Sequence, residues 1–127
     1  MASFKIAQNA TFKAEVEIPR VGFDPIKVDI EFKYRDRKEL AKYYDKWNAE
    51  RDAAAKEAMK DGATWEQATD RQIALEAAQL KEIIVGWSFP EELSDESLTE
   101  LVGTCAGAPA AVLDAYQAAY AVARRGN

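Results

Sequence analysis

The sequence predicts an α+β fold in which a small N-terminal antiparallel β-sheet of about three strands is covered by about four α-helices. Three observations carry this prediction. Apolar and polar residues alternate through residues 3–35, apolar residues recur at helical spacing through residues 36–125, and capping residues and glycines divide this second region into segments. The length of 127 residues fits one domain, so we expect residues 1–127 to form a single domain.

Strands are expected first, because apolar residues occupy alternate positions. Phe4 and Ile6 share one parity, and the same alternation returns in residues 12–18 and again in residues 28–34. A period of two gives each strand one apolar and one polar face. Short polar connections between these segments favour antiparallel pairing. Such a sheet cannot bury its apolar face alone, so the helices that follow are expected to cover it.

The first helix is expected to begin after Asp36, where Glu39 completes a capping-box pattern three residues later. Large apolar residues recur at helical spacing as far as Trp47, and alanine and charged residues dominate after it. We therefore expect this helix to project beyond the core. The pair Asp61-Gly62 is expected to end it, since glycine accepts the left-handed conformation that follows many helices.

Three further helices are expected after this point. Thr64 begins the second helix, whose apolar stripe runs to about Val85, and Gly86 is the expected residue after its end. Ser94 is the expected N-cap of the third helix, which the glycine-bounded segment 103–107 interrupts. Pro109 fits the first position of the last helix, because its missing N–H is not needed there.

Residues 84–93, IVGWSFPEEL, combine a helix end with a connection, and Pro90 cannot continue a helix. Two interpretations of the aromatic residues Trp87 and Phe89 stay open. They fold back onto the core, as large aromatic side chains usually do, or they form an apolar patch that faces a protein partner.

The net charge of −5 arises entirely in residues 82–127, since basic and acidic residues balance in residues 1–81. An acidic C-terminal third repels nucleic-acid phosphates and attracts a basic partner, or it serves as a solvated face. Because of this repulsion we expect no nucleic-acid partner. We also expect no membrane partner, because no apolar run approaches the roughly 20 residues needed to span a bilayer. The absence of a secretory pattern at the start and the single Cys105 favour an intracellular, reducing compartment.

The chain contains no histidine, which removes the commonest general base and most transition-metal sites. We expect no catalytic residue, no cofactor and no metal ion, and hence a protein that is not an enzyme. An acidic cluster near the third helix offers oxygen ligands for a hard cation, but it lacks the spacing of an EF-hand. The positive N-terminal end of a helix also accounts for that cluster, which consists of Glu91, Glu92, Asp95 and Glu96.

The order of elements and several segments resemble one known family. The segments are Gly86-Trp87, the helix containing residues 98–101, and the closing helix with Tyr116, Tyr120 and the tail at residues 124–127. In these features the chain resembles the small tail assembly chaperones of long-tailed, siphophage-type bacteriophages and prophages. The resemblance extends over nearly the whole chain.

The resemblance implies a function that needs no catalysis. Such chaperones bind and solubilise the tape measure protein during tail morphogenesis, in the cytoplasm of the bacterial host, and are absent from the mature virion. It also implies a possible longer form, made by ribosomal frameshifting, that recruits the tail tube protein, and self-association. We expect four aromatic residues to line or border the contact surface: Trp87, Phe89, Tyr116 and Tyr120.

Two alternative functions remain open from the sequence. The first is another small cytoplasmic adaptor that docks a single protein partner, such as an antitoxin. The second is a hydrolase that uses carboxylates, although no pair of acidic residues is convincingly arranged for it.

Overall fold

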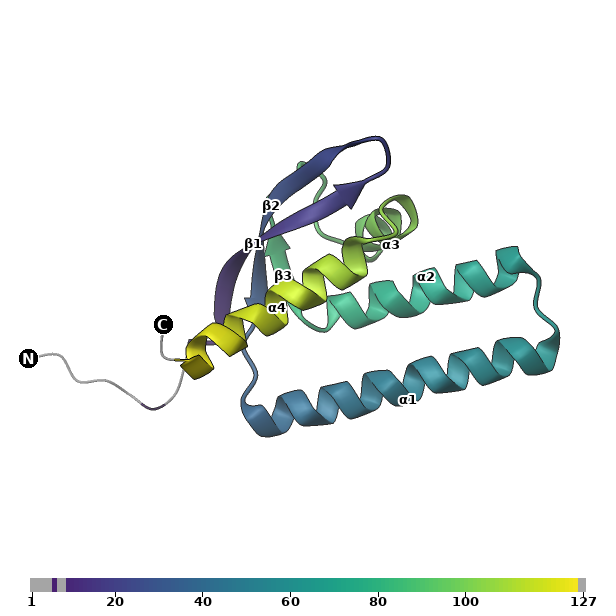
Figure 1. The fold of residues 1–127 in the computed structure, drawn as a ribbon, viewed down its shortest axis with the longest axis horizontal. Helices are drawn as coiled ribbons and strands as arrows, with labels where there is room; N and C mark the ends of the chain where they lie inside the picture. Colours follow the sequence, from purple (N-terminus) through teal and green to yellow (C-terminus); the bar gives the residue numbers. More distant parts are fainter. Residues whose placement is uncertain (1–5, 7–8, 126–127) are drawn as a thin grey trace, which may run out of the picture.

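A twisted antiparallel sheet lies beside a long helical hairpin, one further helix packs against the sheet, and another packs against the hairpin (Figure 1). The computed structural model describes residue 6 and residues 9–125. Within these residues the sheet has the strand order β1-β2-β3, and four helices accompany it. This confirms the predicted α+β class. The elements are β1 (Thr11–Arg20), β2 (Phe23–Lys33), α1 (Arg37–Asp61), α2 (Trp65–Lys81), β3 (Ile84–Trp87), α3 (Asp95–Thr104) and α4 (Ala108–Arg125).

The hairpin β1–β2 forms because the alternation of apolar residues in the two segments is in register. Val16 lies opposite Val28, and both are buried on the face that the helices cover. The charged residues that alternate with the apolar ones along both strands point to the other face of the sheet, and nearly all of them stay exposed. Gly22 closes the turn with φ of 78°, a value that favours glycine. The register shifts next to Pro19, which has no N–H to donate to the ladder.

The third strand is not where the sequence analysis placed it. Phe4 lies outside the described residues, and Ile6 is fully exposed. The strand that completes the sheet is β3, which pairs antiparallel with β2 far along the chain. The predicted second helix is correspondingly too long, because α2 ends at Lys81 and not near Val85.

A bulge in β3 explains why its sequence did not indicate a strand. Ile84 pairs with Phe32, and Gly86 pairs with the preceding residue of β2, so Val85 has no partner across the ladder. The extra residue breaks the period of two and lets Ile84 and Trp87 lie on the same face. Gly86 is therefore a strand residue, and its assignment as a helix C-cap was wrong.

The helix ends follow the predicted capping residues. The side chains of Asp36, Thr64 and Ser94 accept the N–H groups three residues later at the starts of α1, α2 and α3. The reciprocal bond of a capping box is present at Thr64, where Gln67 returns the contact, and at Ser94, where Ser97 does so. The capping box expected at Asp36 is not complete, because only the bond from the N–H of Glu39 is formed there. Gly62 ends α1 with φ of 62°. These local interactions satisfy N–H groups that have no partner inside the helix.

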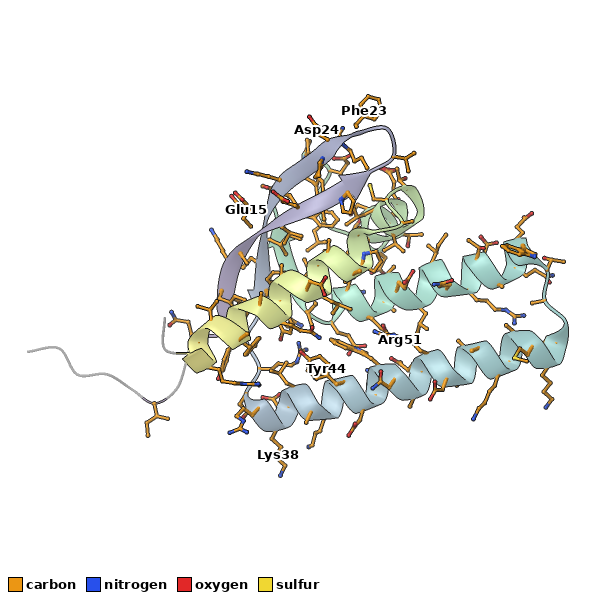
Figure 2. All side chains as sticks on the ribbon, in the orientation of Figure 1. Glu15, Phe23, Asp24, Lys38, Tyr44 and Arg51 are labelled. Carbon is orange, nitrogen blue, oxygen red and sulfur yellow. The ribbon has the colours of Figure 1, made fainter. Side chains whose placement is uncertain are left out.

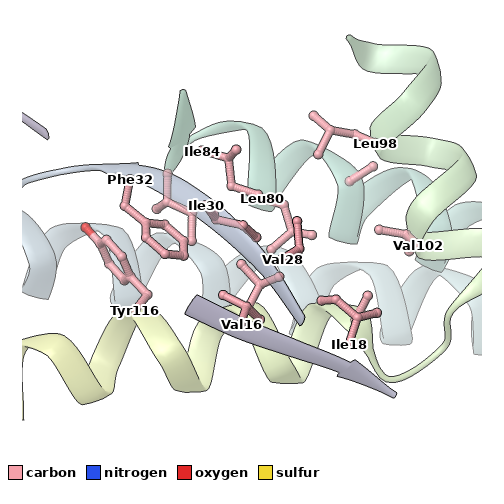
Figure 3. Packing of buried hydrophobic residues seen from close by; sticks show 14 of the residues in the cluster. Val16, Ile18, Val28, Ile30, Phe32, Leu80, Ile84, Leu98, Val102 and Tyr116 are labelled. Carbon is pink, nitrogen blue, oxygen red and sulfur yellow. The ribbon is translucent and has the colours of Figure 1, made fainter. Parts of the chain in front are cut away.

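The apolar core lies between the sheet and the helices. Figure 3 shows Ile30 and Phe32 of the sheet facing the side chains of Leu80 and Tyr116 from two different helices. α4 packs along β1, and α3 packs against α2. None of the helices in the described part of the chain is both long and apolar enough to cross a membrane.

The hairpin α1–α2 extends away from the sheet, as expected from its alanine-rich and charged second half (Figure 1). The buried residues of α1 are Leu40 and Trp47, both in its first half. Near the far end of the hairpin Met59 and Trp65 are almost fully exposed. The first half of α1 is thus fixed to the core, and the second half is attached mainly to α2.

Gly107 is expected to tolerate no side chain, because the start of α4 lies directly against β1. A Cβ atom at this position would lie 2.8 Å from Cγ of Pro19, a contact so short that the helix start or the proline must shift. We expect Gly107→Ala to lower the free energy of unfolding by about 1–3 kcal/mol, measured by urea unfolding. Gly103→Ala is the matched control. Its Cβ would meet Ile73 at an ordinary 3.7 Å, and alanine favours the helix there, so a larger loss at Gly103 would contradict this account.

Candidate partner-binding site

The segment after β3 is held in place by hydrogen bonds to the neighbouring strand. The N–H of Ser88 donates to the carbonyl of Asp29, and the N–H of Asp29 donates to Oγ of Ser88, both at 2.9 Å. The two bonds continue the sheet beyond the end of β3. They fix the direction of the chain on either side of Ser88, and so they position the two aromatic residues that flank it.

Trp87 and Phe89 pack against each other and against the core. Their rings meet edge to face, with centroids 5.1 Å apart and an interplanar angle of 86°. Nε1 of Trp87 donates a hydrogen bond of 2.8 Å to the carbonyl of Glu91. Both side chains are half-buried, so each has one side on the core and one side open. One side of the pair packs on the core, as the first interpretation of the sequence expects. The other side is open, as the second interpretation requires.

The open side of the aromatic pair forms one wall of a small pocket. Its volume is about 130 Å³, which suits one anchoring side chain rather than a drug-sized ligand. Leu101 and Cys105, at the end of α3, supply further apolar lining. Glu91 and Glu100 stand at the rim. The remaining lining residues are Ser97 and Thr104.

The surroundings of the pocket are acidic. Lys81 of α2 forms an ion pair of 2.7 Å with Asp95 at the start of α3. Glu91 and Glu100 are exposed and form no ion pair with any residue that the structure describes. Across residue 6 and residues 9–125, no three His, Cys, Asp or Glu side chains are grouped as metal ligands would be. An apolar pocket with carboxylates at its rim suits an apolar anchor flanked by lysine or arginine.

Tyr116 and Tyr120 occupy a different position, where β2 leaves the sheet. The hydroxyl of Tyr116 donates to the carbonyl of Lys33 at 3.0 Å, and the N–H of Arg35 donates to the hydroxyl of Tyr120 at 3.0 Å. The Tyr120 hydroxyl in turn donates to that of Tyr116 at 3.3 Å. Tyr116 is fully buried and Tyr120 is half-buried. Tyr116 thus stabilises the fold and offers no surface to a partner in this structure.

A buried arginine beside these tyrosines was not foreseen from the sequence. The guanidinium carbon of Arg35 lies 3.8 Å from the centroid of the Tyr43 ring, and the residue is 7% exposed. Burial lowers the pKa of Arg35, but the phenols of Tyr43 and Tyr116 raise it, and the net shift is upward. Arginine stays charged throughout the physiological pH range, and the ring of Tyr43 covers this buried charge. This contact fixes the start of α1 to the end of β2.

The buried phenol of Tyr116 predicts a loss of stability in alkaline solution. Burial raises its pKa, and the hydrogen bond with Tyr120 raises it further. Unfolded tyrosine titrates near a pKa of about 10, so above that pH the unfolded chain loses this proton first. Tyr116 is therefore expected to make its full contribution to the free energy of unfolding below pH ~10. This contribution falls as the pH rises further. Urea unfolding between pH 8 and 11 measures this fall. If the free energy of unfolding of a Tyr116→Phe variant falls as steeply with pH as that of the parent protein, the assignment of this fall to Tyr116 is wrong.

The four predicted contact residues thus form two separate pairs. Trp87 and Phe89 line the acidic pocket beside α3, whereas Tyr120 lines other surfaces of the molecule. Leu101 and Cys105 were not among the contact residues expected from the sequence, although both line this pocket. The available signal was the position of both residues at the glycine-bounded break, Leu101 just before it and Cys105 within it, since a helix end leaves its last turn open on one side.

Comparison with known proteins gives one match. The model of a protein family described as phage tail assembly chaperone matches residues 1–127, the whole chain. No curated protein and no solved structure matched this sequence.

Proposed function

Because this chain belongs to the phage tail assembly chaperone family, we propose that it binds and solubilises the tape measure protein while the tail is built. The family supplies the process in which the protein acts, and it confirms the resemblance found in the sequence. The observation that carries the finer proposal is the half-exposed pair of Trp87 and Phe89 beside an acidic rim. No part of this function requires a bond to be made or broken.

The pocket supports recognition of a helical chain by a simple mechanism. An amphipathic helix presents apolar side chains at intervals of three or four residues, and one of them fits a pocket of about 130 Å³. Glu91 and Glu100 at the rim favour lysine or arginine beside that anchor. A single pocket of this size gives a weak contact. A long partner with many such segments is therefore bound by many copies of the chaperone, each holding one segment.

The proposal extends to the setting implied by the resemblance. The protein acts in the cytoplasm of the bacterial host and leaves before the virion is complete. A longer form made by frameshifting recruits the tail tube protein to the chaperone-bound tape measure. In these steps the protein temporarily covers apolar surface of the tape measure protein, which the tail tube later encloses.

Co-expression tests the proposal directly. The chain is produced together with the product of the very long reading frame beside its gene, and the amount of that product in the soluble fraction is measured. We expect the long product to be soluble and to co-purify with the chaperone, and to precipitate when it is expressed alone. If it stays insoluble in the presence of the folded chaperone, the tape measure is not the client.

A further inference from the structure

A second groove lies on the molecule, between the first half of α1 and the second half of α4. Its volume is about 660 Å³, about five times that of the α3 pocket. Figure 2 shows Tyr44 on the side of α1 that faces α4, whereas Lys38 points away from the molecule. The apolar lining comes from both helices and consists of Leu40, Ala41, Tyr44, Tyr120, Ala121 and Ala123.

The lining is rigid and uncharged at its centre. Leu40 is buried and belongs to the core, and Tyr120 is held by its hydrogen bonds to Arg35 and Tyr116. Burial raises the pKa of Tyr44, so this phenol stays neutral through the physiological range. The small side chains of Ala41 and Ala121 leave space between the two helices. The hollow lies where α1 and α4 make little direct contact with each other.

The charges at this groove have the opposite sign to those at the α3 pocket. Arg37 and Arg124 line it, and none of the residues that line it carries a carboxylate. Neither arginine forms an ion pair within residue 6 and residues 9–125. An apolar groove with a guanidinium on each of its two helices favours an occupant that brings carboxylates to flank its apolar side chains.

The dimensions define the kind of occupant. The lining residues of α1 run from Arg37 to Tyr44, and those of α4 run from Gln117 to Arg124, about two helical turns each. A segment of this length with leucine-like side chains on one face fills a groove between two helices in the manner of helix-in-groove recognition. We propose that the α1–α4 groove binds an acidic amphipathic helix from a protein partner. This inference does not depend on tape measure binding at the α3 pocket.

Two synthetic helical peptides test the proposal. Both carry leucine at positions i, i+3, i+4 and i+7, and one has glutamate and the other lysine at the flanking positions. Each is titrated into the isotope-labelled protein, and amide shifts are followed at Ala41 and Ala121 for the groove and at Leu101 and Cys105 for the pocket. We expect the glutamate peptide to shift the groove residues and to bind there at least about tenfold more tightly than the lysine peptide.

Charge reversal supplies the matched control. Arg37→Glu with Arg124→Glu is expected to abolish the preference for the glutamate peptide at the groove. Lys38→Glu with Lys42→Glu makes the same change in net charge on exposed positions of α1 and is expected to leave the preference intact. Circular dichroism of both double variants confirms that they fold.

Three results would overturn the proposal. The first is an equal loss of the preference for the glutamate peptide in both double variants, which would show that this preference depends on net charge alone. The second is a response confined to residues outside the groove. The third is a concentration-dependent shift of Ala41 and Ala121 without any peptide, which would make a second copy of this chain the occupant. Amide shifts at Leu101 and Cys105 are scored separately. Binding or its absence at the α3 pocket therefore does not decide the test of the α1–α4 groove.

Discussion

Replacing Trp47 by alanine is expected to lower the free energy of unfolding by about 3–5 kcal/mol, the loss usual for a large aromatic residue in a core. Trp47 is 2% exposed and packs on the rings of Tyr43 and Tyr44. It lies where α1 meets α2, and Gln79 donates a hydrogen bond of 3.4 Å to its carbonyl. Removal of the indole leaves a cavity at the point that fixes the helical hairpin to the rest of the molecule.

The control for this prediction lies on the same hairpin. Trp65 is 93% exposed, so Trp65→Ala is expected to change the free energy of unfolding by less than about 0.5 kcal/mol. Trp47→Phe is expected to lose less than Trp47→Ala, since it keeps a ring, and the buried Nε1 of Trp47 has no hydrogen-bond partner among the described residues. Urea unfolding followed by circular dichroism measures all three variants. Similar losses for the two alanine variants would show that the hairpin is not held through Trp47.

Reversing the charges at the rim of the α3 pocket is expected to abolish solubilisation of the partner. Glu91→Lys with Glu100→Lys turns an acidic rim into a basic one, at two exposed positions that carry no ion pair within the described residues. Binding of a partner with basic residues beside its apolar anchor should weaken by at least about tenfold. The measurement is the soluble fraction of the co-expressed long product, and raised salt should weaken binding to the parent protein as well.

Two further variants separate binding from folding. Glu57→Lys with Glu66→Lys makes an equal charge change on exposed positions of the helical hairpin and should leave solubilisation unchanged. Trp87→Ser with Phe89→Ser should abolish solubilisation, and it should also lower stability, since each ring has one side on the core. If the rim variant folds and still solubilises the long product as well as the parent does, the contact surface lies elsewhere.

The sequence by itself determined the class of fold and most of the element ends. Alternation of apolar residues specified the β1–β2 hairpin, because a strand places successive side chains on opposite faces. Asp36, Thr64 and Ser94 specified the helix starts, because a capping side chain acts within three residues of its own position. Both signals are local in the chain and need no knowledge of distant residues.

Only the tertiary structure decided which segments meet. β3 is a strand because β2 offers it an edge, and its bulge at Val85 hides the period that would have revealed it. The burial of Tyr116 and the open side of Trp87 follow in the same way from neighbours far along the chain. The α1–α4 groove depends on the spacing between two helices, which is set by the core beneath them and not by the residues of either helix alone.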